Sequence, residues 1–477
     1  MSAGTSESIE VLATPSTGRQ GRDLTRAAQL VATGELSPVQ LVHECLQRAE
    51  AGAAANAFTD LFAEDALRAA RALQELLHAG HRLGPLHGVP VAIKDNIDIA
   101  GKRSTAGSSI LADRVASTDA PVVAKLRSAG AIVIGHTGMH EFAWGGTSDN
   151  PHTGTVRNAY DLERTPGGSS GGSAVAVALG ACCAALGTDT GGSVRLPAAL
   201  NGVTGLRPGI GRIDVTGVVP LAWSMDTVGP MARSARDCTL LTAVLTGQAV
   251  PARRRSNARG LRIGLIEGYS LTHLQAPVEE AFRSALNALT GAGAVLVDVN
   301  VEDVEGNISA QLTVEAAEPS TYHQQWLRQR PQDYGADVRL LLEAGELLPA
   351  TTYLQAQRYR SLLRDQVLQA LEVSDVLATP TLPFTATPIG ASTVEVVPGR
   401  PEPVLSAIMQ FTGLPSLTGL PAVSVPCGID EDGLPIGMQL IGRPGGEMAL
   451  LEAAEVFQEL THFHLRTPTY PLGTTER

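Results

Sequence analysis

A segment rich in glycine and serine decides how this chain is interpreted: residues 165–195 read TPGGSSGGSAVAVALGACCAALGTDTGGSVR. Two glycine-serine turns, at 167–172 and 191–193, flank a run of small apolar residues, and that run predicts a buried helix from Ser173 onward. Glycine and serine alone are typical of a flexible linker. Because these turns adjoin a buried element, we expect their backbone N–H groups and hydroxyls to converge on one small ligand.

The pattern upstream predicts an α/β fold. Two apolar runs, at 89–93 and 131–135, predict buried strands, and the segment 120–129 between them predicts a helix. This order favours a large, mixed, mostly parallel twisted sheet covered by helices on both faces. We expect a single domain over 21–470, with a helical sub-lobe around 300–375.

Composition indicates a globular protein without a nucleic-acid surface. The chain has 477 residues, of which 44% are hydrophobic, and a net charge of −12. Its Lys and Arg residues form no basic stripe, so we expect no nucleic-acid partner. The short run Arg253-Arg254-Arg255 is interpreted as a solvated surface connection.

Cysteine usage and the absence of a targeting segment predict a cytoplasmic protein. The five cysteines are odd in number and lack the spacing of a disulfide framework. Residues 1–20 lack the apolar core of a signal peptide and are expected to be a disordered arm, with 471–477 as a tail. The longest charge-free apolar stretch, 173–187, has 15 residues, too few to cross a membrane.

Ser193 is the candidate nucleophile. A serine hydroxyl needs a partner base, and the preceding Thr190, Gly191 and Gly192 can present successive N–H groups to a developing oxyanion. The alternative is a phosphate loop, but neither turn has the Gly-Lys-Ser/Thr ending of a nucleotide P-loop.

Lys94 is the candidate base. No histidine lies in a Gly-x-Ser-x-Gly context, whereas Lys94 ends a buried strand, where desolvation lowers a lysine pKa. A neutral lysine can accept a proton, and serine–lysine pairs are a known variant of the catalytic triad. The alternative for a lone lysine after a strand is a surface residue.

Several blocks together resemble the amidase signature family. They are the segments at 91–96, 167–173, 187–195, 201–208 and 419–428, in the family's order, and the likeness covers about 20–465. The resemblance implies that family's α/β fold and a Ser–cis-Ser–Lys triad. In that triad Ser193 is the nucleophile, Ser169 follows a cis peptide bond and relays the proton, and Lys94 is the base. It also implies an oxyanion hole formed by the backbone N–H groups of Thr190, Gly191, Gly192 and Ser193.

Three further residues are expected to support this site. Ser170 would hold the first turn. Asp189 and Arg195 flank the nucleophile, and either they form a salt bridge that braces the loop or Arg195 binds a substrate carboxylate.

The substrate pocket is predicted less directly. Trp144 and Trp223 are candidates for its walls, although a tryptophan is often simple packing. His136 and His140 have the i, i+4 spacing of a metal pair, but glycines at 135 and 138 disfavour a helix there, so no metal and no cofactor are expected. Asn201 stands where many family members have cysteine, which leaves the substrate class open.

The predicted function is hydrolysis of a linear C–N bond in a small-molecule amide, urea or carbamate through an acyl-enzyme on Ser193. The alternative is the glutaminase component of a tRNA-dependent amidotransferase complex, which would share the triad but need partner chains. A catalytically inactive binding protein is a third hypothesis, against which the complete Lys/Ser/Ser set argues. The resemblance also allows a homodimer.

Overall fold

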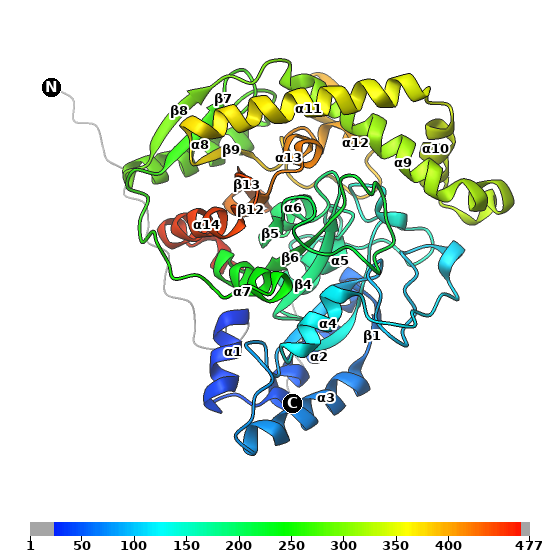
Figure 1. Cartoon of the computed structure of the whole chain (residues 1–477), viewed down its shortest axis with the longest axis vertical. Helices are drawn as coiled ribbons and strands as arrows, with labels where there is room; N and C mark the ends of the chain where they lie inside the picture. The colour runs from blue at the N-terminus through cyan, green and yellow to red at the C-terminus, as the bar shows by residue number, and fades with distance from the viewer. Residues whose placement is uncertain (1–22, 469–477) are drawn as a thin grey trace.

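The computed structural model describes residues 23–468; the predicted N-terminal arm (1–20) and tail (471–477) lie outside the described residues. Its main sheet is made of β1 (Phe58–Leu61), β2 (Pro90–Lys94), β3 (Ile132–Thr137), β4 (Ala184–Asp189), β5 (Thr204–Arg207), β6 (Thr227–Ala232), β7 (Arg262–Ile266), β8 (Val295–Val299), β9 (Val376–Pro380), β12 (Ala422–Ile429) and β13 (Pro435–Ile441). Within residues 23–468 these eleven strands run in the order β1-β3-β2-β4-β6-β5-β12-β13-β9-β7-β8 (Figure 1). β10 (Thr393–Val397) and β11 (Arg400–Pro403) form a separate antiparallel pair.

The sheet is mixed, as predicted, but the expected majority of parallel pairs is not found. Of the neighbouring pairs in the described chain, β2–β3, β2–β4, β7–β8 and β7–β9 are parallel. The other six, including all those in the centre of the sheet, are antiparallel. The reason is the connectivity: β12 and β13 are joined by a tight turn, which can only produce an antiparallel pair.

Helices surround the sheet (Figure 1). They are α1 (Leu24–Thr33), α2 (Pro38–Ala51), α3 (Ala63–His78), α4 (Pro121–Ser128), α5 (Gly171–Ala178), α6 (Arg195–Leu200), α7 (Ala235–Thr246), α8 (Ala276–Gly291), α9 (Asn307–Gln329), α10 (Ala336–Glu346), α11 (Ala350–Val373), α12 (Val404–Ala407), α13 (Gly413–Thr418) and α14 (Glu447–Thr461). Local sequence explains several starts: the Ser37 hydroxyl accepts from the Gln40 amide, and Pro38 occupies the first turn.

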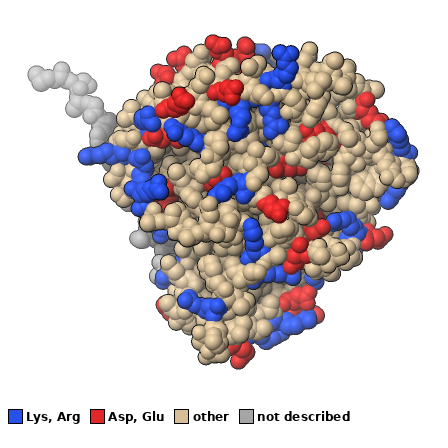
Figure 2. Space-filling view, in the orientation of Figure 1, with Lys and Arg blue, Asp and Glu red and all other residues tan. Residues whose placement is uncertain are grey.

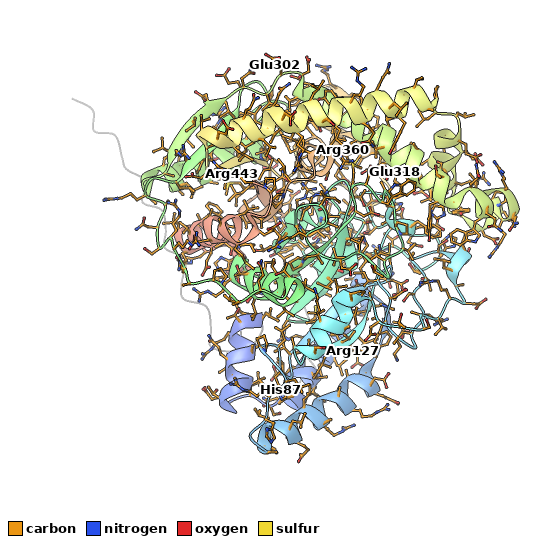
Figure 3. The ribbon with its side chains drawn as sticks, in the orientation of Figure 1. His87, Arg127, Glu302, Glu318, Arg360 and Arg443 are labelled. Atoms are coloured by element: carbon orange, nitrogen blue, oxygen red, sulfur yellow. The ribbon has the colours of Figure 1, made fainter. Side chains whose placement is uncertain are left out.

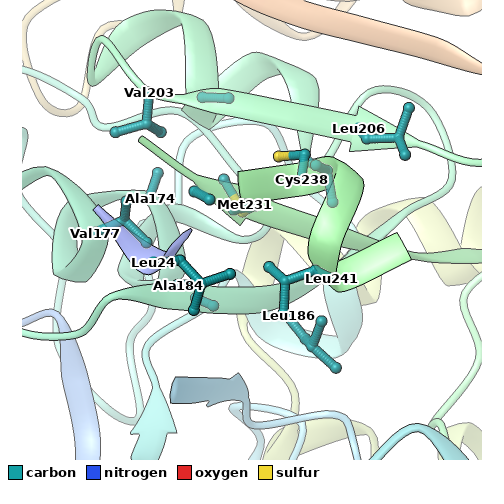
Figure 4. Close-up of a cluster of buried hydrophobic side chains, with 14 of the residues drawn as sticks. Leu24, Ala174, Val177, Ala184, Leu186, Val203, Leu206, Met231, Cys238 and Leu241 are labelled. Carbon is teal, nitrogen blue, oxygen red and sulfur yellow. The ribbon is translucent and has the colours of Figure 1, made fainter. Parts of the chain in front are cut away.

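The largest apolar cluster lies around β4, β5 and β6 (Figure 4). Helices α5 and α7 pack against these strands, and all of α5 is buried. The labelled side chains are Leu24, Ala174, Val177, Ala184, Leu186, Val203, Leu206, Met231, Cys238 and Leu241. Because α5 follows the first glycine-serine turn and β4 precedes the second, this cluster fixes both turns relative to each other.

Helices α9, α10 and α11 occupy the segment where the helical sub-lobe was expected, and they lie together in the upper part of Figure 1. Helix α9 also contacts α13, and α11 contacts β7 and β9. The division into one domain with a sub-lobe stays a prediction.

The surface of the described chain carries charges of both signs, interspersed over the face shown in Figure 2. In the predicted surface run 253–255, the Arg253 guanidinium forms two hydrogen bonds to the Glu459 carboxylate, of 2.7 and 2.6 Å. All five cysteines are buried and free. Among residues 23–468 no helix is long and apolar enough to traverse a bilayer.

Candidate active site

Lys94 and Ser169 meet in the interior of the protein. Lys94 is the last residue of β2, its side chain is fully buried, and its Nζ is hydrogen-bonded to Ser169 Oγ at 2.7 Å. It also donates to Thr188 Oγ1 at 2.8 Å. Burial lowers the pKa of Lys94 to about 7, against the opposing charges of Asp189 and Asp226. A substantial fraction of this amine is therefore uncharged near neutral pH and able to accept a proton.

The turn that carries Ser169 is held by backbone and side-chain contacts. The Gly168–Ser169 peptide bond is cis, as the resemblance implied. The Ser148 hydroxyl donates to the carbonyls of Gly167, at 2.9 Å, and Ser169, at 3.3 Å. The His140 amide donates to the Ser169 carbonyl at 3.2 Å. A Cβ at Gly168 would come within 2.8 Å of the Ser148 amide nitrogen, so the turn requires a glycine there.

Ser193 lies on the adjacent turn, directly after β4. Ser193 is 8% exposed, whereas Ser169 and Ser170 are fully buried. The two turns are joined by a hydrogen bond of 3.2 Å from the Ser170 amide to the Ser193 carbonyl. The Ser170 hydroxyl donates to the Thr188 carbonyl at 3.1 Å, which is the contact that a supporting role requires. Within residues 23–468 no hydrogen bond joins the hydroxyls of Ser193 and Ser169, so the structure brings Lys94 and Ser169 into contact and leaves Ser193 on the neighbouring loop.

The Asp189 carboxylate sits behind this loop between two arginines. Arg195 binds it through Nε at 3.0 Å and Nη2 at 2.8 Å, and Arg207 donates to it through Nη1 at 3.0 Å. Burial opposes the charged form of Asp189, but Arg195 and Arg207 outweigh it and hold the pKa of this carboxyl well below its usual range. Arg207 was not among the predicted residues, although it lies in the resembling block 201–208, 14 residues after Ser193.

The geometry favours the bracing role of Arg195 over contact with substrate. Arg195 is completely buried, and its remaining N–H groups donate to the Thr412 carbonyl, Gln439 Oε1 and Ser416 Oγ at 3.0, 2.6 and 2.7 Å. All of its donors are used inside the protein, so no donor remains for a substrate carboxylate.

Asp189 also decides which amides can face an oxyanion. Its oxygens accept the N–H groups of Gly192 and Val194, both at 3.1 Å. The Gly192 amide is therefore not free for the predicted oxyanion hole. In the described part of the chain, the amides of Thr190, Gly191 and Ser193 donate no hydrogen bond, which leaves these three as candidates.

Sequence reasoning missed two side chains of the site. The Thr188 hydroxyl binds Lys94 and also accepts from Asn96 Nδ2 at 3.1 Å. Asp226 accepts the Thr190 hydroxyl at 2.5 Å and the amides of Leu221 and Ala222 at 3.0 and 3.1 Å. A signal for Thr188 existed, because it lies in the same block as Ser193, but nothing in the local sequence marks Asp226.

The two tryptophans do not wall one pocket. Trp144 is buried and lines a hollow of about 340 Å³ together with His140, Asp337 and Ile408. Trp223 is 50% exposed and lines a different hollow. Their role as walls of an acyl pocket stays a prediction.

The two histidines contact different parts of the protein. His140 Nε2 contacts Asp337 Oδ2 at 2.9 Å, whereas His136 Nε2 contacts the Ile97 carbonyl at 3.3 Å. Among residues 23–468 no three potential metal ligands come together in one cluster.

Comparison with known proteins places this chain in a family. The sequence profile of the Amidase family matches residues 40–451. One glutamyl-tRNA(Gln) amidotransferase component, from Cupriavidus necator, is 38% identical, over 93% of this chain and 97% of that protein. An amidase of Pseudomonas putida is 39% identical with the same coverage of both chains. The crystal structure of an amidase superposes with a TM-score of 0.87 at 37% identity, covering 92% of this chain and 99% of that one.

The family match and the relatives define a hydrolase that acts on the C–N bonds of amides. The chain belongs to the amidase family, whose members are also called amidase signature enzymes.

Proposed function

We propose that this chain cleaves linear amide C–N bonds by forming an acyl-enzyme on Ser193, with Lys94 as the base and Ser169 as the proton relay. The observation that carries the proposal is the buried hydrogen bond of 2.7 Å between Lys94 Nζ and Ser169 Oγ, made by an amine whose pKa is lowered to about 7. No cofactor is needed for this chemistry.

The proposed steps move one proton in each direction. Ser193 Oγ attacks the carbonyl carbon while its proton passes to Ser169, whose own proton passes to Lys94. The amides of Thr190, Gly191 and Ser193 stabilise the oxyanion. The C–N bond then breaks, and the leaving nitrogen takes the proton back from Lys94 through Ser169. Water repeats the path to release the acid and restore Ser193.

Labelling tests the nucleophile directly. A phosphonyl or sulfonyl fluoride should add its mass to the peptide containing Ser193, and Ser193→Ala should abolish both labelling and turnover while the fold persists. Ser256→Ala, at an exposed serine, is the matched control and should change neither. Labelling confined to Ser169 or Ser170 would show that the wrong serine has been assigned.

Two substrate assignments share this site. The curated relatives favour the glutaminase component of a complex, because the Cupriavidus necator protein carries the name of one chain of an amidotransferase. The Pseudomonas putida amidase and the crystal structure of an amidase support a free-standing amidohydrolase. Ureas and carbamates remain in the range of the second assignment, because the same acyl chemistry serves them.

The assignments differ in whether the chain acts alone. Purified protein should be assayed for ammonia release from glutamine and from a panel of small amides, with and without proteins that copurify with it. Unassisted turnover of small amides favours the free-standing enzyme. Release of ammonia from glutamine only with partner chains favours the amidotransferase complex. A homodimer and a cytoplasmic location stay predictions; the five free thiols support the latter.

A further inference from the structure

Helix α9 places two polar side chains directly against the loop that carries the candidate oxyanion amides. An ideal Cβ at Gly191 would lie 2.3 Å from Gln311 Nε2 and 2.5 Å from Glu315 Oε1. Only a glycine at 191 leaves room for this approach. Gln311 and Glu315 are one helical turn apart, and Gln311 Nε2 donates to Glu315 Oε1 at 3.0 Å.

The Glu315 carboxyl has an unused oxygen. Glu315 is only 3% exposed, and its Oε1 accepts a hydrogen bond from Gln311. Oε2 has no hydrogen-bond partner among the described residues. Glu315 is therefore a nearly buried carboxyl with one unpaired oxygen, on a side chain whose other oxygen lies against the loop at Gly191, and such a group calls for a partner.

The surroundings of Glu315 disfavour an anion. Burial raises the pKa of Glu315 to about 8; the Gln311 hydrogen bond opposes this, and Asp226 and Asp189 add to it. Nearby, Glu318 accepts the Ser224 amide at 3.0 Å and the Tyr353 hydroxyl at 2.9 Å. A substrate carboxylate here would raise the pKa of Glu315 further, whereas an ammonium group would favour its ionised form.

Arg207 partly opposes the rise in the pKa of Glu315, but the nearby guanidinium groups are bound to other partners. Arg195 and Arg207 are fully buried and face Asp189. Arg360 extends from α11 on the side where Glu318 lies on α9 (Figure 3), and it donates to the hydroxyl and the carbonyl of Ser224 at 3.0 and 2.8 Å. A carboxylate entering beside Glu315 would therefore find the local arginines committed to the protein.

We propose that Glu315 determines substrate specificity: its free oxygen binds an amine or ammonium N–H close to the scissile carbonyl, so the enzyme prefers amides that carry a positively charged amine there. Gln311 positions the carboxyl. This inference rests on the proposed function, because it concerns the substrate of that same site.

Matched substrates test the preference. β-Alaninamide, butyramide and succinamate present an ammonium, a methyl and a carboxylate group at the same distance from the carboxamide. We expect wild type to hydrolyse β-alaninamide with the highest kcat/KM and succinamate with the lowest. In Glu315→Gln, which keeps the shape of the side chain, the ratio of kcat/KM between β-alaninamide and butyramide should fall by about tenfold, mainly through KM.

Glu302→Gln is the control, because Glu302 is exposed and lies at the top edge of Figure 3. This control should keep the wild-type ratio. An unchanged ratio in Glu315→Gln, or a wild-type preference for succinamate, would overturn the inference.

A binding measurement separates this inference from the proposed reaction. In the Ser193→Ala background, calorimetry should show an affinity for β-alaninamide that falls by about tenfold when Glu315→Gln is added. Loss of this affinity in a protein whose wild type hydrolyses no amide would reject the proposed function and retain the ammonium site. Hydrolysis that does not depend on Glu315 would retain the proposed function and reject the ammonium site. Should Glu315→Gln fail to fold, equal affinity of Ser193→Ala for β-alaninamide and succinamate would by itself overturn the inference.

Discussion

Lys94 and Ser169 are 75 positions apart in the chain, yet their Nζ and Oγ atoms are joined by a hydrogen bond of 2.7 Å in a fully buried setting. The strand that ends at Lys94 lies beside β4, and the turn holding Ser169 leads into the helix that covers β4. The contact therefore depends on the sheet, on α5 and on the glycine turn together.

The pH dependence of activity should report on Lys94. Because the proposed base is the neutral amine, kcat/KM should rise with pH through about 7 and level off above it. Lys94→Ala should lower kcat by about 100- to 10,000-fold and remove this limb of the profile. A pH–rate series on both proteins checks this, with Lys102→Ala, a lysine paired with Asp65 outside the site, as the control. A mild loss with the limb intact would make Lys94 a bystander.

Removing Ser148 should loosen the turn of Ser169. Ser148→Ala deletes the donor to the carbonyls of Gly167 and Ser169 and the acceptor of the Gly171 amide. We expect a loss of about 1–3 kcal/mol in the free energy of unfolding, measured with urea, and a lower kcat. Exposed Ser361→Ala should have neither effect. Equal stability of the Ser148 and Ser361 variants would contradict the bracing role.

Removing Arg195 should lower the stability of the folded protein. Arg195→Ala leaves the buried Asp189 carboxylate with one partner fewer and should cost about 3–5 kcal/mol, read as a lower Tm and urea midpoint. Arg68→Ala, at an exposed ion pair, should cost little. The substrate-contact alternative would be favoured instead if Arg195→Lys kept the Tm and raised KM only for carboxylate-bearing amides.

Gly191 should not tolerate a side chain. In Gly191→Ala, the new Cβ would meet Gln311 Nε2 at 2.3 Å and Glu315 Oε1 at 2.5 Å, so these two side chains or the loop must shift. We expect kcat to fall by about 100-fold or more, because a displaced oxyanion donor costs about that much. Gly291→Ala, where a Cβ meets nothing within 4 Å, should retain full activity. Steady-state kinetics on both variants makes the comparison, and equal rates would show that the loop adapts.

The site residues that were predictable share one property: local sequence determines their surroundings. Lys94 follows an apolar run that must be a buried strand, so its low pKa could be expected before the fold was known. The second glycine turn adjoins Asp189 and Arg195, so a bracing pair was one of two open alternatives. Glycine-rich turns next to buried elements are visible because their backbone requirements exclude most other residues.

The residues that were missed depend on distant segments. Helix α9 lies in the segment 300–375 where a helical sub-lobe was expected, but its bounds were not predicted. It contains Pro319 and many polar residues, so its sequence lacks a clear apolar face, and its contacts with α10, α11 and α13 stabilise it. Its Gln311 and Glu315 reach the oxyanion loop across more than a hundred positions. Asp226 likewise reaches Thr190 from a separate loop. The tryptophans were assigned to one pocket from residue type alone, which carries no spatial information.

By itself, the sequence determined the class of fold, the family and the candidate Lys94, Ser169 and Ser193 set, because strand periodicity and glycine-dependent turns are local properties of the chain. Only the tertiary structure decided which amides of the second turn have no hydrogen-bond acceptor, which groups accept the hydrogen bonds of Arg195, and that the Glu315 carboxyl lies against the loop. These depend on hydrogen bonds and burial between segments far apart in the chain, whose partners are set by packing and not by neighbouring residues.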